Sequence, residues 1–214
     1  MLSYRKLAMR VLGRPLHTGG GNDSPRPASQ RAAAFVLTAA LLTGAAFPAF
    51  AGTYYIEDGD IVISAGTEAG TNKVEQTGKD TVDNDKDTVI TNHDKDTASS
   101  NTVTIEAKDK DDKVEVTLKD VNIDTSSRSE AAVSVTGEGN TNIELDGDNE
   151  LKSGGYHAGL EKNELESKGT LTIKDDKGKD GSLTAEGGDK GGAGIGGGME
   201  STGSNITIRG GTVE

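Results

Sequence analysis

The segment Val116–Ile123, with the sequence Val-Thr-Leu-Lys-Asp-Val-Asn-Ile, decides the fold of this chain. It holds two apolar-polar-apolar triplets around a polar Lys-Asp pair, and such alternation is typical of short β-strands with one buried face. The first triplet recurs as Ile143–Leu145, Leu171–Ile173 and Ile206–Ile208, with first-residue spacings of 27, 28 and 35. The chain therefore repeats a strand unit.

Two further strand signatures follow the first in the same order along the chain. The second begins at Val121, Asn149, Leu183 and Thr212, and the third contains Val133, Leu160 and Ile195. Three strands per repeat, each too short to fold alone, predict an all-β chain that forms a right-handed parallel β-helix with three strands per coil. A β-sandwich is the competing interpretation, because short strands with turn residues also suit that fold.

The signatures divide the chain into three parts. Residues 1–51 are predicted to be a signal peptide, residues 52–112 an irregular N-terminal β region with the first coils, and residues 113–214 the β-helix repeat domain. Ile61–Ile63 predicts an opening strand or hairpin, and Val103–Ile105 a first coil strand. The polar Lys-Asp-Thr repeats between them indicate either solvated turns or a partly mobile loop. Because the sequence ends inside a strand signature, we expect a domain truncated at its C-terminus.

The first 51 residues have the features of an export signal. Six basic residues and one acidic residue precede an apolar run from Ala32 to Ala46, and Ala49 and Ala51 are the small residues of a signal peptidase site. We predict cleavage before Gly52 and a secreted or cell-surface location. The alternative is a retained membrane anchor, but a spanning helix needs about 20 apolar residues, more than this run provides.

The composition after Gly52 excludes several classes of protein. This part has no Pro, Phe, Trp or Cys, and its net charge is −17, from 17 Lys and Arg against 34 Asp and Glu. Such a charge argues against binding to nucleic acid or to a membrane surface after cleavage, and favours cations. Without aromatic residues or disulfides, the interior must be built from aliphatic side chains.

The part of the chain from Val103 to Glu214 contains the segments Val116–Ile123, Asn142–Leu151, Gly192–Gly198 and Asn205–Val213. On these segments it resembles the Gly-rich calcium- and carbohydrate-binding β-helix repeats of Gram-positive cell-surface proteins, whose fold is similar to that of polysaccharide lyases. It implies a secreted or wall-associated module that binds a plant cell-wall or bacterial polysaccharide, with bound calcium and no catalysis.

Candidate binding residues follow from the chemistry of sugars and of calcium. Tyr156 is the one aromatic residue within the regular repeats, and an aromatic ring suits the apolar face of a sugar. Calcium prefers several oxygen ligands, and the predicted turns of successive coils supply Asp120, Asp124, Asp146, Asp148, Asn149, Asp175 and Asp176. The alternative is that these acidic residues only make the coil corners soluble.

Two other functional classes stay open. An adhesin stalk would use the same coils only to project a distal domain, and the sequence separates it poorly from a binding module. A lyase or hydrolase would need a base or paired carboxylates in a cleft, and Asp175-Asp176 is the one adjacent acidic pair on a regular coil. The lone His157 beside Tyr156 fits a turn residue better than a base or a ligand. We therefore predict that the chain is not an enzyme.

Overall fold

The computed structural model describes residues 51–178 and 180–214, so the predicted signal peptide lies outside the described residues except for Ala51. The strands form three sheets, named A, B and C here. Sheet A contains β1 (Thr53–Tyr55), β5 (Thr88–Thr91), β7 (Lys113–Lys119), β10 (Asn140–Asp146), β13 (Leu171–Lys174) and β16 (Ile206–Ile208). Sheet C contains β8 (Asn122–Asp124), β11 (Asp148–Lys152), β14 (Ser182–Glu186) and β17 (Thr212–Val213).

Sheet B is the longest of the three. In spatial order it contains β15 (Ile195–Gly196), β12 (Leu160–Glu161), β9 (Val133–Gly137), β6 (Val103–Ala107), β2 (Ile61–Ala65), β3 (Asn72–Gln76) and β4 (Val82–Asp85). All of its pairs from β15 to β2 are parallel, whereas β2, β3 and β4 pair antiparallel. A short 3-10 helix, η1 (Ile56–Asp58), joins β1 to β2.

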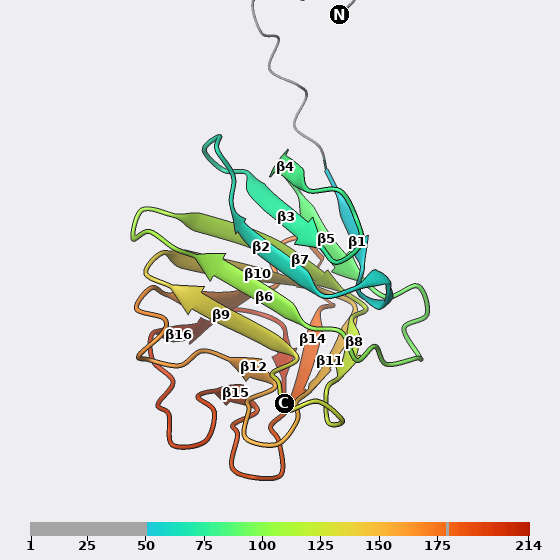
Figure 1. The fold of residues 1–214 in the computed structure, drawn as a ribbon, viewed down its shortest axis with the longest axis vertical. Helices are drawn as coiled ribbons and strands as arrows, with labels where there is room; N and C mark the ends of the chain where they lie inside the picture. The colour runs from blue at the N-terminus through green and yellow to red at the C-terminus, as the bar shows by residue number, and fades with distance from the viewer. Residues whose placement is uncertain (1–50, 179) are drawn as a thin grey trace, which may run out of the picture. The chain divides into compact units, whose positions relative to one another are not determined.

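The first turn, from β1 through η1 to β2, passes from sheet A to sheet B without a strand of sheet C. From β5 onward the chain passes from sheet A to sheet C to sheet B, and the turns stack in order of sequence (Figure 1). In the turn from β5 to β6 the place on sheet C is held by Ser99, which bridges to Ile123. The fold is therefore a parallel β-solenoid of about four turns. This confirms the predicted parallel β-helix with three short strands per coil and excludes the β-sandwich.

Aliphatic ladders fill the interior, as the alternating triplets predict. On sheet B the ladder runs through Ile61, Val103, Val133, Leu160 and Ile195, which are paired strand by strand. The first four are at most 1% exposed. Each buried aliphatic side chain stabilises the fold by about 1.5–3 kcal/mol relative to leaving it exposed. Stacked aliphatic residues at equivalent positions of successive coils thus take the place of large aromatic side chains in the core.

Thr141 and Lys162 are two of the buried polar residues that interrupt these ladders. Thr141 lies between Val114 and Leu171 on sheet A and is fully buried, and its hydroxyl has no hydrogen-bond partner among the described residues. Lys162 follows Leu160 by two positions, as Val135 follows Val133, and is also fully buried. Both residues should weaken the core, since a buried polar group without full hydrogen bonding is unfavourable.

The register of sheet A differs from the predicted alignment at one strand. Ile143 pairs with Val116 as expected, but it pairs with Ile173 and not with Leu171. A shift of two residues keeps every side chain on its own face, so the alternation alone cannot detect it. The added length lies in the connection from sheet B to sheet A at residues 162–170, which is longer than the connection at 138–139.

The N-terminal region is more ordered than the sequence indicates. Ile61–Ile63 lies in β2 and Val103–Ile105 in β6, which confirms both predicted strands. The Lys-Asp-Thr stretch, predicted as solvated turns or a mobile loop, instead contains strands β4 and β5. Fully buried Asp85 ties this region together, since it accepts hydrogen bonds from Gly52 N, Tyr54 Oη and Thr88 Oγ1 at 2.9–3.0 Å.

Candidate functional site

The outer face of sheet B carries a row of hydroxyl side chains. Because strand residues alternate between faces, Thr104 on β6 and Ser134 and Thr136 on β9 point away from the ladders. Ser134 Oγ donates a hydrogen bond to Thr104 Oγ1 at 3.3 Å, across two successive coils. This row forms the floor of a hollow of about 270 Å³, the sheet B groove, lined by Thr102, Thr104, Glu130, Ala131, Ser134, Thr136, His157, Glu161 and Glu166.

One wall of the groove is the connection that leads into β9. Arg128 in this connection donates to both carboxylate oxygens of Asp60, at 3.0 and 3.3 Å, and also pairs with Glu130. Burial works to raise the pKa of Asp60, but its bonds to Arg128 and to Thr102 outweigh that effect and lower the pKa. Arg128 therefore links the connection that carries Glu130 to Asp60 in the first coil by charged hydrogen bonds.

The next coil adds a fixed carboxylate–imidazole pair to the groove, since Glu161 on β12 pairs with Ser134 on β9. Glu161 is only 7% exposed and accepts hydrogen bonds from Ala158 N at 2.9 Å and Asn163 Nδ2 at 3.0 Å. Its carboxylate also lies 3.0 Å from Nδ1 of His157. A carboxylate held in this way orients the imidazole, which lines the groove. His157 is thus more than the turn residue predicted from the sequence.

No sequence signal identifies this pair in advance. His157 and Glu161 are four residues apart, but they lie around a bend and the start of β12 rather than on a helix. Only the strand alternation around Leu160 indicates that Glu161 faces outward. The groove therefore depends on loop packing that a period-two pattern does not describe.

Tyr156, the predicted carbohydrate-binding residue, does not line the groove. Its side chain is 43% exposed, and Lys190 Nζ lies 4.8 Å from its ring centroid, in cation–π contact. The lysine therefore covers part of the ring that would have to receive a sugar.

The predicted calcium ligands separate into two groups. Asp120, Asp146, Asp148 and Asn149 lie at the corner between sheets A and C, and Asp175 and Asp176 lie at the same corner one coil later, whereas Asp124 lies at the other end of β8. At the corner, Asp148 N donates to Asp120 Oδ1 at 3.3 Å and Lys119 pairs with Asp146 at 2.6 Å. Asn149 is 1% exposed and its side chain bonds four backbone groups, at Val121, Asp146, Gly147 and Ser182.

The remaining candidates have local partners. Asp124 accepts a hydrogen bond from Ser126 N at 2.8 Å, and its bonds to Ser126 lower its pKa. Asp175 accepts from Gly181 N at 3.3 Å, and Asp176 lies 3.4 Å from Lys174 Nζ. Within residues 51–178 and 180–214, no three His, Cys, Asp or Glu side chains are grouped as a metal ion would require. Calcium binding stays a prediction.

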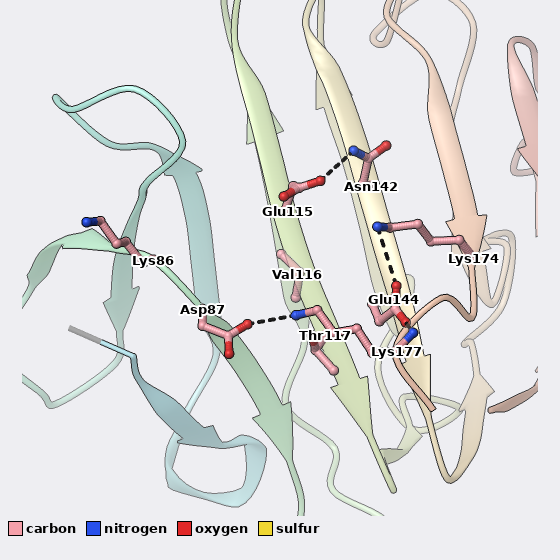
Figure 2. Close-up of a pocket in the computed structure, with 9 residues that line it drawn as sticks. All are labelled: Lys86, Asp87, Glu115, Val116, Thr117, Asn142, Glu144, Lys174 and Lys177. Carbon is pink, nitrogen blue, oxygen red and sulfur yellow. Dashed lines mark hydrogen bonds and ion pairs between the residues drawn. The ribbon is translucent and has the colours of Figure 1, made fainter. Parts of the chain in front are cut away.

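A smaller cavity lies on the outer face of sheet A (Figure 2). Its central residue is Glu144, which is 3% exposed and accepts hydrogen bonds from Asp176 N and Lys177 N at 2.7 and 2.6 Å. Its other oxygen has no hydrogen bond and lies 3.5 Å from Lys174 Nζ. The cavity measures about 60 Å³, far below the roughly 300 Å³ of a ligand pocket. It has room for water but not for a sugar.

Comparison with known proteins does not add an assignment. No family model matches the chain, and no curated protein or solved structure matches it either. Among the described residues, no helix is long and apolar enough to cross a bilayer.

Proposed function

We propose that this protein is an extracellular, non-catalytic polysaccharide-binding module whose binding surface is the sheet B groove. The observation that carries the proposal is the row of outward hydroxyls on β6 and β9, flanked by carboxylates, in a hollow of about 270 Å³. Sugar hydroxyls both donate and accept, and they pair well with hydroxyl and carboxylate side chains. Coils at the ~4.8 Å strand spacing offer similar groups to successive parts of an extended glycan.

The charge of the groove favours a neutral polysaccharide. Glu130, Glu161 and Glu166 line it, and none of the residues that line it in the described part of the chain is Lys or Arg. A glycan that carries carboxylates, such as a polyuronate, would be repelled. Because no Phe, Tyr or Trp lines the groove in the described part of the chain, we expect modest affinity, with a Kd on the order of 0.1–1 mM for a short oligosaccharide.

A glycan array followed by titration of the best neutral oligosaccharide tests the proposal. The double variant Thr104→Val/Ser134→Ala removes two floor hydroxyls, and we expect it to weaken binding about tenfold, or 1.4 kcal/mol. The matched control is Ser182→Ala/Thr184→Val on β14 of sheet C, which should bind as the unaltered protein does. Equal affinity of the two double variants would remove the groove from the site.

The other outcomes of the array separate the alternatives. A protein that binds no glycan would favour the adhesin stalk. Reducing or unsaturated ends released from a bound glycan would show catalysis, and loss of that release in His157→Ala would locate it at the groove. Export is tested separately, since a secreted protein should begin at Gly52.

Calcium assistance is a further part of the proposal, and it rests on the acidic corner between sheets A and C. If a calcium ion joins Asp120, Asp146 and Asp148, millimolar calcium should raise the unfolding temperature above its value in chelator. The variant Asp148→Asn should abolish that rise, while Asp124→Asn should not. An unfolding temperature that calcium leaves unchanged would remove calcium from the proposal.

A further inference from the structure

A further cavity lies at the N-terminal end of the solenoid, between β1 and the β3–β4 hairpin. It measures about 210 Å³ and is called the Tyr55 pocket here. It is lined by Thr53, Tyr54, Tyr55, Asp58, Val74, Gln76, Lys79, Asp80 and Val82. None of these residues lines the sheet B groove. The pocket combines an apolar wall, with Val74 and Val82, and a polar rim.

The ring of Tyr55 is held in a fixed plane. It stacks on the imidazole of His93 with ring centroids 3.7 Å apart and an angle of 5° between the planes. His93 Nε2 lies in turn 3.4 Å from Asp58 Oδ1. One face of the tyrosine ring is therefore covered by His93, and the part that lines the pocket is rigid. A rigid aromatic surface is suited to the apolar C–H face of a sugar ring.

Gln76 supplies an oriented acceptor that has no partner among the described residues. The side chain is 8% exposed, and its Nε2 donates to the backbone oxygens of Tyr55 at 2.7 Å and of Gly59 at 3.2 Å. Because both partners are acceptors, they fix the orientation of the amide, and Oε1 is left facing away from them. Oε1 has no hydrogen-bond partner among the described residues, although Gln76 lines the pocket. Because this oxygen is accessible rather than enclosed, a ligand in the pocket can donate a hydrogen bond to it.

The rim adds charged groups that are already ordered. Lys79 Nζ lies 3.2 Å from Asp58 Oδ2, and this contact is the main cause that lowers the pKa of Asp58. The Asp58 carboxylate is therefore ionised at neutral pH and accepts hydrogen bonds. Asp80 also lies at the rim. Carboxylates beside an aromatic ring fit a ligand with several hydroxyl donors.

We propose that the Tyr55 pocket binds one neutral pyranose unit, as a free sugar or as the end of a glycan. The apolar face of the sugar lies on Tyr55, one hydroxyl donates to Gln76 Oε1, and others donate to the Asp58 and Asp80 carboxylates. The inference goes beyond the proposed function, because it rests on a different cavity and on residues that the groove does not use.

Titration of the protein with a panel of neutral hexoses and N-acetylhexosamines, followed by two-dimensional NMR, tests this site. We expect at least one sugar to shift the side-chain amide resonances of Gln76, with a Kd on the order of 1–10 mM. Tyr55→Ala should raise that Kd about tenfold or more. Tyr156→Ala is the matched control, since it removes the same side chain from a position outside the pocket, and it should leave the Kd unchanged.

The proposal would be overturned if no sugar of the panel binds up to about 50 mM, well above the expected Kd. It would also be overturned if binding leaves the Gln76 amide resonances unshifted, or if Tyr55→Ala and Tyr156→Ala weaken binding equally. If Tyr55→Ala fails to fold, Val82→Trp provides the second variant, because it fills the pocket from β4 and should abolish the shifts. The groove variant Thr104→Val/Ser134→Ala should retain monosaccharide binding. The two sets of variants thus distinguish an incorrect proposal for the pocket from an incorrect proposal for the groove.

Discussion

Replacing the buried lysine of the solenoid should make the protein more stable. Lys162 is fully enclosed, and its ammonium group has a single hydrogen bond among the described residues, to Ser167 O at 2.9 Å. Burial lowers its pKa, although the charge of Glu164 works in the opposite direction. Methionine has a similar length and no charge, so Lys162→Met keeps the shape of the side chain and removes the buried ammonium.

The magnitude follows from three contributions. Burying an ammonium group costs several kcal/mol, and one hydrogen bond from a charged donor returns about 1.5–3 kcal/mol. Lys162→Met removes both and leaves the Ser167 carbonyl without this donor, which costs about 1–3 kcal/mol. We therefore expect Lys162→Met to increase the free energy of unfolding by about 1–2 kcal/mol at pH 7.

The gain should also depend on pH in a predictable direction. In the folded protein Lys162 has a pKa below the usual 10.5, so between these two values the unfolded chain binds more protons. The unaltered protein then gains stability as pH rises, by up to about 1.4 kcal/mol per pH unit. Lys162→Met lacks this titration, so its advantage should shrink as the pH rises toward 10.5.

Urea unfolding at several pH values provides the measurement, with Lys113→Met as the control. Lys113 is exposed at the start of β7, and its replacement should change stability by less than about 0.5 kcal/mol. A Lys162→Met protein less stable than the unaltered one, or with the same advantage at every pH, would refute the reasoning.

Three further predictions concern single contacts. Thr141→Val should raise the free energy of unfolding in urea by about 1–2 kcal/mol, because the hydroxyl that it removes is buried and has no partner among the described residues. Thr125→Val is the control. It removes a hydroxyl that lies within hydrogen-bond distance of two backbone carbonyls, so it should lower the free energy of unfolding by about the same amount. Asp85→Ala should lower the melting temperature and increase hydrogen exchange in β1 and β5, since several donors lose a buried acceptor. Because the pKa of Asp60 is lowered, its pairing with Arg128 stabilises the fold above pH ~4, and this stabilisation is lost on acidification. In Asp60→Asn the free energy of unfolding should therefore fall less steeply below pH ~4. The difference should be less than about 1 kcal/mol, since the carboxylate is 38% exposed.

The ladders of the solenoid could be predicted because they depend on a local rule applied repeatedly. The alternation in Val116–Ile123 assigns the inward residues, and its recurrence identifies the coil. The pairing of Val133, Leu160 and Ile195 on sheet B follows directly from the third signature. The two-residue shift at Leu171 could not be predicted, since it depends on the length of the connection at residues 162–170.

The candidate sites were less accessible to sequence reasoning. Residues that line the sheet B groove, such as Thr104, Glu130 and His157, come from coils that only the fold brings together. The open acceptor on Gln76 depends on two hydrogen bonds to distant backbone oxygens. Acidic residues at coil turns were visible in the sequence, but their partners were not, and Asn149 proves to bond the backbone of three neighbouring segments.

The scarcity of aromatic residues also limits where an aromatic side chain could stack on a bound sugar. The interior of each coil is filled by aliphatic ladders, so a large ring inside a middle coil would displace the neighbouring coils. At the N-terminal end of sheet A that constraint is relaxed, and Tyr54 packs there beside Ile90 while Tyr55 faces outward toward His93. The middle coils are left with hydroxyl and carboxylate side chains on their outer faces. A glycan bound to this protein would thus stack on an aromatic ring at the end of the solenoid and form mainly hydrogen bonds along its side.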